Sequence, residues 1–210
     1  MKIKIIALAT VAVSLAACAT VYTDENFTDF QKTHKTVAVV PFSVTIDQKN
    51  LPKDVNIDSL KASEIEEGEI FQRQLYSQFL NQYQKGKYTI KFQDVDETNV
   101  LLRRNNMSGE NLSKFTKSEI GQMLKVDSVI SGTIKRAKPL STGAAVASAL
   151  LLGYGNTNEV NVNMTLHDSG TGSLLWSYDH HATGGIGSSP ERLSKSLMKQ
   201  TSTKFPYKAK

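Results

Sequence analysis

The sequence predicts an α/β domain with a single mixed, partly antiparallel sheet and packed helices, in the order β-α-β-α-α-β-β-β-α. Three patterns predict this class. Residues 36–42 form a continuous apolar run rich in β-branched residues, typical of a strand covered on both faces. Residues 60–84 carry apolar side chains at helical spacing. From residue 159 onward, apolar and polar residues alternate along two successive runs, which is typical of antiparallel strands with one face in water.

The first half of the domain is expected to hold a covered strand, a loop and a long helix. The strand at 36–42 is closed by a proline, and residues 43–59, with Asp, Lys, Asn and Pro, predict a long loop. The positions expected to face the core from the helix at 60–84 are Ile65, Gly68, Phe71, Leu75, Phe79 and Tyr83. Four glutamates in its first turns favour the helix dipole, and we interpret them as a solvated face rather than as catalytic carboxylates.

The second half supplies the remaining elements. A short strand is expected at 88–92, short helices at 96–104 and 113–125, and a third strand at 126–135 with a glycine at Gly132. Residues 159–167 alternate, residues 168–172 (DSGTG) predict a hairpin turn, and 174–183 returns as the next strand. On that strand we expect one face to carry Leu174, Trp176, Tyr178 and His180. A terminal helix begins at Pro190.

The N-terminus has the pattern of a lipoprotein signal peptide, which we assign to residues 1–17. Lys2 and Lys4 give a positive start, and the apolar run from Ile5 to Leu15 is too short to span a bilayer. Residues 15–18 (LAAC) match the lipobox that precedes a lipid-modified cysteine, so we expect acylation of Cys18. More than one acyl chain would give stable anchoring in membrane lipid. An ordinary signal peptide with a coincidental cysteine is the alternative.

Residues 18–35 are mostly polar and are expected to form a short tether to a periplasmic domain at 36–204. The aromatic residues Tyr22, Phe27 and Phe30 could dock the end of this tether on the domain. Ala19 follows the cysteine, whereas the enterobacterial sorting rule uses Asp there for retention at the inner membrane. We therefore expect the periplasmic face of the outer membrane, in preference to the inner membrane.

Residues 141–156 (STGAAVASALLLGYGN) form an insertion between the third and fourth strands, where a few residues would suffice. No charge occurs from Pro139 to Thr157, and the run is too short for a transmembrane helix. Two interpretations stay open: a hydrophobic loop that folds back on the domain, or an element that self-associates or touches a membrane.

Neither the composition nor the motifs indicate a catalytic site. Removal of the signal peptide leaves 23 of the 25 basic side chains against 20 acidic ones, and no basic cluster interleaves with aromatics, so nucleic-acid binding has no support. Gly184–Gly187 lacks both phosphate-binding patterns. The neighbouring His180 and His181 point to opposite faces of a strand, whereas His167 and His181 share the wet face and could form a two-histidine site only if the register allowed. We expect solvated strand histidines, no metal and no cofactor.

Three segments together resemble a known family: TVAVVPF at 36–42, SEIGQMLKVDSVISGTI at 118–134 and VNVNMTLHDSGTGSLLWS at 160–177. They are similar to the periplasmic lipoprotein superfamily of the curli-secretion channel lipoprotein and the penicillin-binding-protein activator lipoprotein, and to small outer-membrane lipoproteins of unknown function. The resemblance implies a protein that acts by binding, with no catalytic residues to transfer. This sequence differs from those family members in two ways: the tether is short, and only residues 141–156 could replace the membrane-inserting hairpins of the channel.

We therefore expect a non-enzymatic, lipid-anchored periplasmic protein that acts by protein–protein contact in cell-envelope assembly or secretion, with a homo-oligomer as one form. The alternative is an oligomeric ring or channel subunit of a secretion system that uses residues 141–156. An enzyme with an unrecognised site is the third hypothesis.

Overall fold

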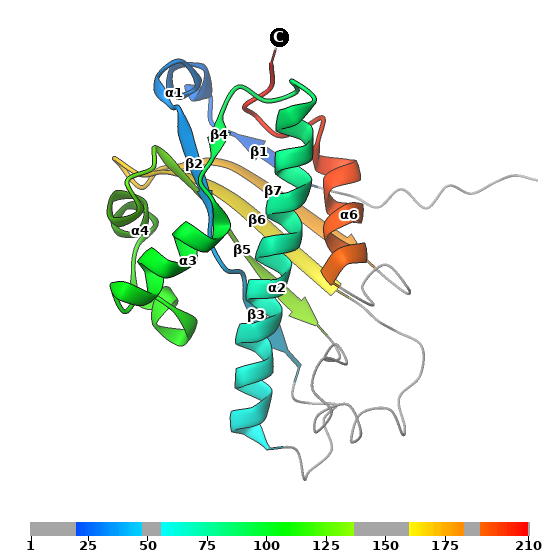
Figure 1. Cartoon of the computed structure of the whole chain (residues 1–210). Coiled ribbons are helices and arrows are strands. Elements are labelled where there is room, and N and C mark those ends of the chain that lie inside the picture. The colour runs from blue at the N-terminus through cyan, green and yellow to red at the C-terminus, as the bar shows by residue number, and fades with distance from the viewer. Residues whose placement is uncertain (1–19, 48–55, 137–159, 183–189, 210) are drawn as a thin grey trace, which may run out of the picture.

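The computed structural model describes residues 20–47, 56–136, 160–182 and 190–209. Its centre is one mixed, seven-stranded sheet that does not close into a barrel, as the sequence predicts (Figure 1). The strands are β1 (Val21–Thr23), β2 (Thr36–Val39), β3 (Ser43–Ile46), β4 (Lys91–Phe92), β5 (Ser128–Arg136), β6 (Val160–Asp168) and β7 (Leu174–Ala182). The helices are α1 (Phe27–Thr33), α2 (Ile57–Gln84), α3 (Val95–Arg104), the 3-10 helix η2 (Gly109–Lys114), α4 (Lys117–Leu124) and α6 (Pro190–Thr201).

The sheet joins a parallel part to an antiparallel part through β5. The strand order is β1-β7-β6-β5-β2-β4, and β3 also pairs with β5. β2 lies parallel to the first residues of β5, and β3 lies parallel to its last residues, with Val37 opposite Ser128 and Ile46 opposite Arg136. β5, β6, β7 and β1 are antiparallel to one another in turn. Both the covered first strand and the alternating hairpin therefore occur as predicted.

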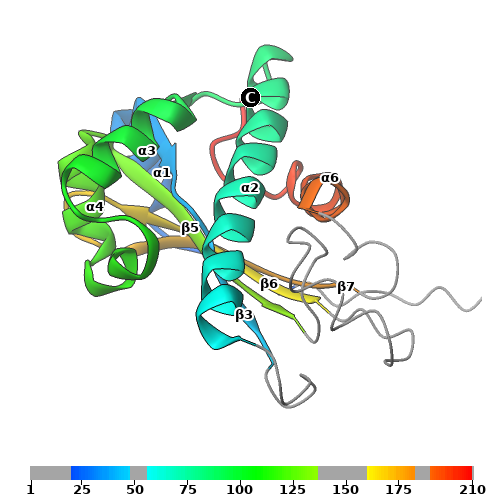
Figure 2. The same cartoon turned by 60° about the horizontal axis from the view of Figure 1, so that its bottom comes forward.

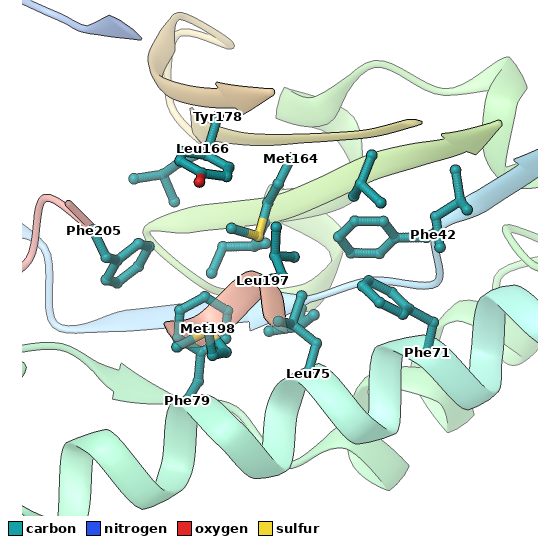
Figure 3. Close-up of a cluster of buried hydrophobic side chains, with 14 of the residues drawn as sticks. Phe42, Phe71, Leu75, Phe79, Met164, Leu166, Tyr178, Leu197, Met198 and Phe205 are labelled. Carbon is teal, nitrogen blue, oxygen red and sulfur yellow. The ribbon is translucent and has the colours of Figure 1, made fainter. Parts of the chain in front are cut away.

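Helices α2 and α6 cover one face of the sheet, where the larger core lies (Figures 1 and 3). In Figure 3, Phe71, Leu75 and Phe79 of α2 point toward the sheet, and Met164 of β6 points back at them. All four side chains are completely buried. Burial of this apolar surface is the main favourable term in folding, so the helical spacing of 60–84 reports the face of α2 that packs on the sheet.

The opposite face is covered by α3, η2 and α4, over β2, the start of β5 and the end of β6 (Figure 2). Its smaller core joins Ala38 and Val40 to Leu102 of α3 and Ile120 of α4. α4 begins at a capping box, in which the hydroxyl of Thr116 accepts from the amide of Glu119 and the Glu119 carboxylate accepts from the amide of Thr116. Among the described residues, no helix covers this face over the later part of β5, the first part of β6, or β7.

The structure corrects two predictions about the first part of the chain. The expected tether contains β1 and α1: Val21 pairs with Tyr178 of β7, and Phe27 is buried in the main core. Both elements are short, three and seven residues, so neither shows a periodic pattern in the sequence. The expected loop at 43–59 contains β3. Docking of the aromatic end of the tether, which the sequence suggested, does occur at Phe27 and Phe30.

The sequence predicts the wrong face of β7 for Leu174. It is 37% exposed, whereas its neighbour Leu175 is fully buried. The reason is an irregularity of the β6–β7 pairing between Leu166 and His167, which places Leu174 opposite His167 and Trp176 opposite Leu166. One extra residue in a strand turns the side chains that precede it to the opposite face of the sheet.

Candidate functional site

The candidate site is the part of the sheet that the helices leave uncovered, together with a groove beside it. Alternate residues of three neighbouring strands point to this face, because side chains in a strand alternate between its two faces. We call them the open face: Ser131, Thr133, Lys135, Asn161, Asn163, Thr165, Ser177, Asp179 and His181. Apart from Ser131, all are half-buried or exposed.

Hydrogen bonds between strands tie the side chains of the open face together. The hydroxyls of Ser131 and Thr165 lie 3.0 Å apart. The Asn163 amide donates to the Asp179 carboxylate at 2.8 Å, and His181 Nδ1 lies 2.7 Å from the side-chain oxygen of Asn161. Each pair joins residues directly opposite in the sheet register. Cross-strand pairs stabilise a sheet, so this face presents an ordered, mainly neutral array of amide and hydroxyl groups.

A groove of about 780 Å³ runs from the open face to helix α2. Thr133, Asn163 and Thr165 line its sheet side. The opposite wall comes from α2 and η2, where Ile65 and Leu112 are half-buried apolar residues. The rim carries charges of both signs: Lys61, Glu64, Glu69, Glu110, Lys114 and Lys117. Apolar lining with a polar rim is the usual composition of a docking groove.

Lys117 is the most unusual charge of this rim. Burial lowers the pKa of its ammonium group. Burial, with a further contribution from Lys117, also lowers the pKa of His167, so the two groups lie close enough to repel. The structure gives Lys117 no acidic partner among the residues it describes.

A second hollow, of about 240 Å³, lies at the other end of the open face. Lys135, Asn161 and His181 line it, and it shares Thr133 and Asn163 with the groove. The two hollows are therefore neighbours on the sheet.

A buried polar cluster elsewhere contains Ser, His and Asp but does not form a nucleophile–base pair. His34 Nε2 lies 3.0 Å from Asp168, and His34 Nδ1 lies 2.5 Å from the hydroxyl of Tyr207. The Tyr207 hydroxyl donates to Ser128 Oγ at 3.1 Å, so Tyr207 separates the serine from the histidine. Burial raises the pKa of Tyr207 well above its usual value. A catalytic base must contact its nucleophile, so we assign this cluster a structural role.

The two-histidine site is wrong. His181 lies opposite Asn161, whereas His167 lies opposite Leu174. Asn161 and His167 are separated along β6 by roughly 20 Å at the usual rise of a strand. His180 and His181 do point to opposite faces, since His180 is 3% exposed and His181 is exposed. No group of three or more potential metal ligands occurs within the described part of the chain.

The glutamates of α2 are also less solvated than expected. Glu67 is 1% exposed and forms an ion pair with buried Arg136 at the end of β5. Glu64 accepts a hydrogen bond from the amide of Ile46 at 2.8 Å. Cys18, residues 141–156 and Gly184–Gly187 lie outside the described residues.

No pattern in the sequence indicates the groove. Its lining comes from β3, α2, η2, β5 and β6, which are far apart in the chain. Only their packing brings Ile65, Leu112 and Asn163 to one hollow. Within the described ranges, no helix is both long and apolar enough to cross a membrane.

Comparison with known proteins finds similarity at the level of solved structures. No family model matches the chain, and no curated protein matches it. Lipoprotein GNA1162 from Neisseria meningitidis is 15% identical, with a TM-score of 0.40, over 80% of this chain and 94% of that one. A PelC dodecamer from Paraburkholderia phytofirmans is 14% identical, with a TM-score of 0.39, over 91% and 99%.

The C-terminal domain of LpoB from Salmonella enterica is 13% identical, with a TM-score of 0.34, over 71% of this chain and 82% of that one. All three matches are at low sequence identity.

Proposed function

We propose that this chain is a lipid-anchored protein of the cell envelope that acts by protein–protein contact, in envelope assembly or secretion. Cys18 would carry the acyl chains, and the domain would face the periplasm from the outer membrane. The observation that carries the proposal is the open face of β5, β6 and β7 together with the groove that continues from it.

An open polar face is common in antiparallel sheets and would not by itself imply a partner. The groove adds a different feature, since Ile65 and Leu112 offer apolar surface between the charged residues of its rim. A partner segment could bury these side chains and hydrogen-bond to the amides of the adjoining strands. Association of this kind gains most from a desolvated apolar centre and uses the polar rim for specificity.

The anchoring part can be tested by metabolic labelling with a palmitate analogue and by cell fractionation. We expect the parent chain to be labelled and to float with outer membranes, and Cys18→Ser to lose both properties. A Cys18→Ser chain that remains labelled and membrane-bound would contradict the lipid anchor.

The contact surface can be tested by site-specific photocrosslinking in intact cells. A photoreactive residue at Asn163, or at Lys114 on the groove rim, should capture the same envelope protein. The matched control is Arg104, an exposed residue at the end of α3 that does not line the groove. Equal capture from Arg104, or no capture from either groove position, would contradict the proposal.

The same cells can test the channel alternative. A large detergent-extracted ring that conducts ions across liposomes, and loses conductance when residues 141–156 are deleted, would favour a channel subunit. A small particle without conductance would favour the proposed protein that acts by protein–protein contact.

A further inference from the structure

One end of the sheet lies next to the predicted lipid anchor. The first described residue is Thr20, whose carbonyl accepts a hydrogen bond from the amide of Asp179 at 3.0 Å. Thr20 is two residues from Cys18, so the acylated cysteine lies within about 7 Å of it even when the chain is fully extended. Only Ala19 therefore separates the predicted anchor from the described domain, which begins at Thr20 opposite Asp179.

The sheet register shows which other residues share this end. Thr45, Lys135, Asn161 and His181 lie opposite one another in turn, across β3, β5, β6 and β7. His181 is two residues beyond Asp179, so this row lies two residues closer to the end of β7 than the level of Thr20. The strand ends Arg136 and Val160, which flank the predicted insertion, are paired one residue further on. In Figure 1 the arrowheads of β3, β5 and β7 lie at this end, away from α1 and α4.

One exposed hydrophobic side chain lies at the same end. Four large hydrophobic residues are exposed among those described: Val21, Tyr22, Ile57 and Leu174. Val21 and Tyr22 lie on the edge strand opposite Tyr178 and Ser177, in the middle of β7. Ile57, 45% exposed, begins α2 at the end of the helix that lies near β3. Leu174 lies at the opposite end, beside the hairpin turn.

We propose that this end of the domain, marked by Thr20, Ile57, Lys135 and His181, rests on the lipid surface. The partner is the membrane that holds the acyl chains, and the inference rests on the anchoring of Cys18 proposed above. Ile57 would add an apolar contact to the one that the acyl chains make. The 168–172 turn then points away from the membrane, about 25 Å further along the strands.

The orientation can be tested with the lipidated full-length chain in liposomes. The chain has a single cysteine, and acylation would consume its thiol, so an introduced cysteine would be the only reactive one. We would attach a fluorophore at His181→Cys and Lys135→Cys near the anchor, and at Ser173→Cys and Gln122→Cys at the far end. All four positions are exposed. Each variant is first checked for cooperative unfolding.

Lipids with a nitroxide on the headgroup quench only fluorophores that approach them closely. We expect several-fold stronger quenching at His181→Cys and Lys135→Cys than at the two far positions. Equal quenching at both ends, or stronger quenching at Ser173→Cys, would overturn the orientation while leaving the anchor intact. A chain that binds liposomes equally well as Cys18→Ser would instead contradict the anchor itself.

A second measurement addresses the hydrophobic contact. Ile57→Ser, in the His181→Cys background, should reduce the quenching, because it removes apolar surface from the contact. Leu174→Ser is the control, since it removes another exposed hydrophobic side chain, from the opposite end. Unchanged quenching in Ile57→Ser, or an equal loss in the control, would overturn the role of this side chain.

Discussion

His34 and Asp168 are hydrogen-bonded across 3.0 Å in the protein interior, although they are 134 residues apart in the sequence. Asp168 also accepts from the amide and hydroxyl of Thr171, which shapes the hairpin turn. The other ring nitrogen of His34, Nδ1, is hydrogen-bonded to the hydroxyl of Tyr207 near the C-terminus. One imidazole therefore joins the end of α1, the β6–β7 turn and the C-terminal segment.

We predict that Tyr207→Phe destabilises the fold by about 1–2 kcal/mol, because it leaves His34 Nδ1 and Ser128 Oγ without the tyrosine hydroxyl. Urea unfolding measures the change. Tyr22→Phe is the matched control, since Tyr22 is 45% exposed and its hydroxyl can bond to water. Equal effects of the two substitutions would contradict a structural role for the buried network.

For the buried ion pair between Glu67 and Arg136, we predict that removing one charge destabilises the fold more than replacing both residues. Their side chains are 1% and 3% exposed, so removal of one charge leaves the other desolvated. We expect Glu67→Gln to cost about 3–5 kcal/mol, and the double variant Glu67→Leu/Arg136→Met to recover most of that loss.

The half-exposed pair of Arg73 and Glu69, on the same helix, is the control, and Glu69→Gln should cost less than about 1 kcal/mol. Thermal and urea unfolding of all three variants test the comparison. A double variant no more stable than Glu67→Gln would show that the pair cannot be replaced by apolar packing.

Gly68 predicts a steric effect at the crossing of α2 and the sheet. A Cβ at this position would overlap the carbonyl oxygen of Phe42, a backbone atom that cannot move aside. Gly68→Ala should therefore destabilise the fold by about 2 kcal/mol or more.

Gly86→Ala separates this effect from backbone strain, since Gly86 has a φ of +70° and no atom near its Cβ position. We expect it to cost about 1 kcal/mol. A Gly68→Ala variant as stable as Gly86→Ala would mean that α2 can move away from Phe42.

Two histidines with lowered pKa values predict the pH dependence of stability. Burial lowers the pKa of His180, with a smaller contribution from His181, and burial and Lys117 lower the pKa of His167. The folded state thus favours the neutral rings, while the unfolded state binds protons near the usual pKa of about 6.5. Their contribution is present above that value and is lost as the pH falls.

We expect the free energy of unfolding to decrease between pH 7.5 and 5.5, and to decrease less in His180→Asn and His167→Asn. The slope against pH is the measurement, because either substitution also changes the absolute stability. Slopes equal to that of the parent in both variants would contradict this origin of the pH dependence.

Several elements could be predicted from sequence because their packing imposes a period on it. Phe71, Leu75 and Phe79 repeat at helical spacing where α2 meets the sheet, and Val160, Val162 and Met164 alternate where β6 has one covered face. β1 has three exposed residues and no period, and it forms only because the edge of β7 is free to pair. Leu174 was misplaced because a bulge changes the facing of a strand without any residue that signals it.

The sequence by itself determined the elements of the sheet that bury regular apolar patterns, and it supports the anchor prediction at Cys18 through a local motif. Only the tertiary structure decided that Glu67 meets Arg136, that His167 and His181 lie apart, and that Ile65 and Leu112 share a groove with Asn163. The physical reason is that periodic burial is a local property of a helix or strand. Pairing register and the contacts between distant elements depend instead on how the whole chain packs.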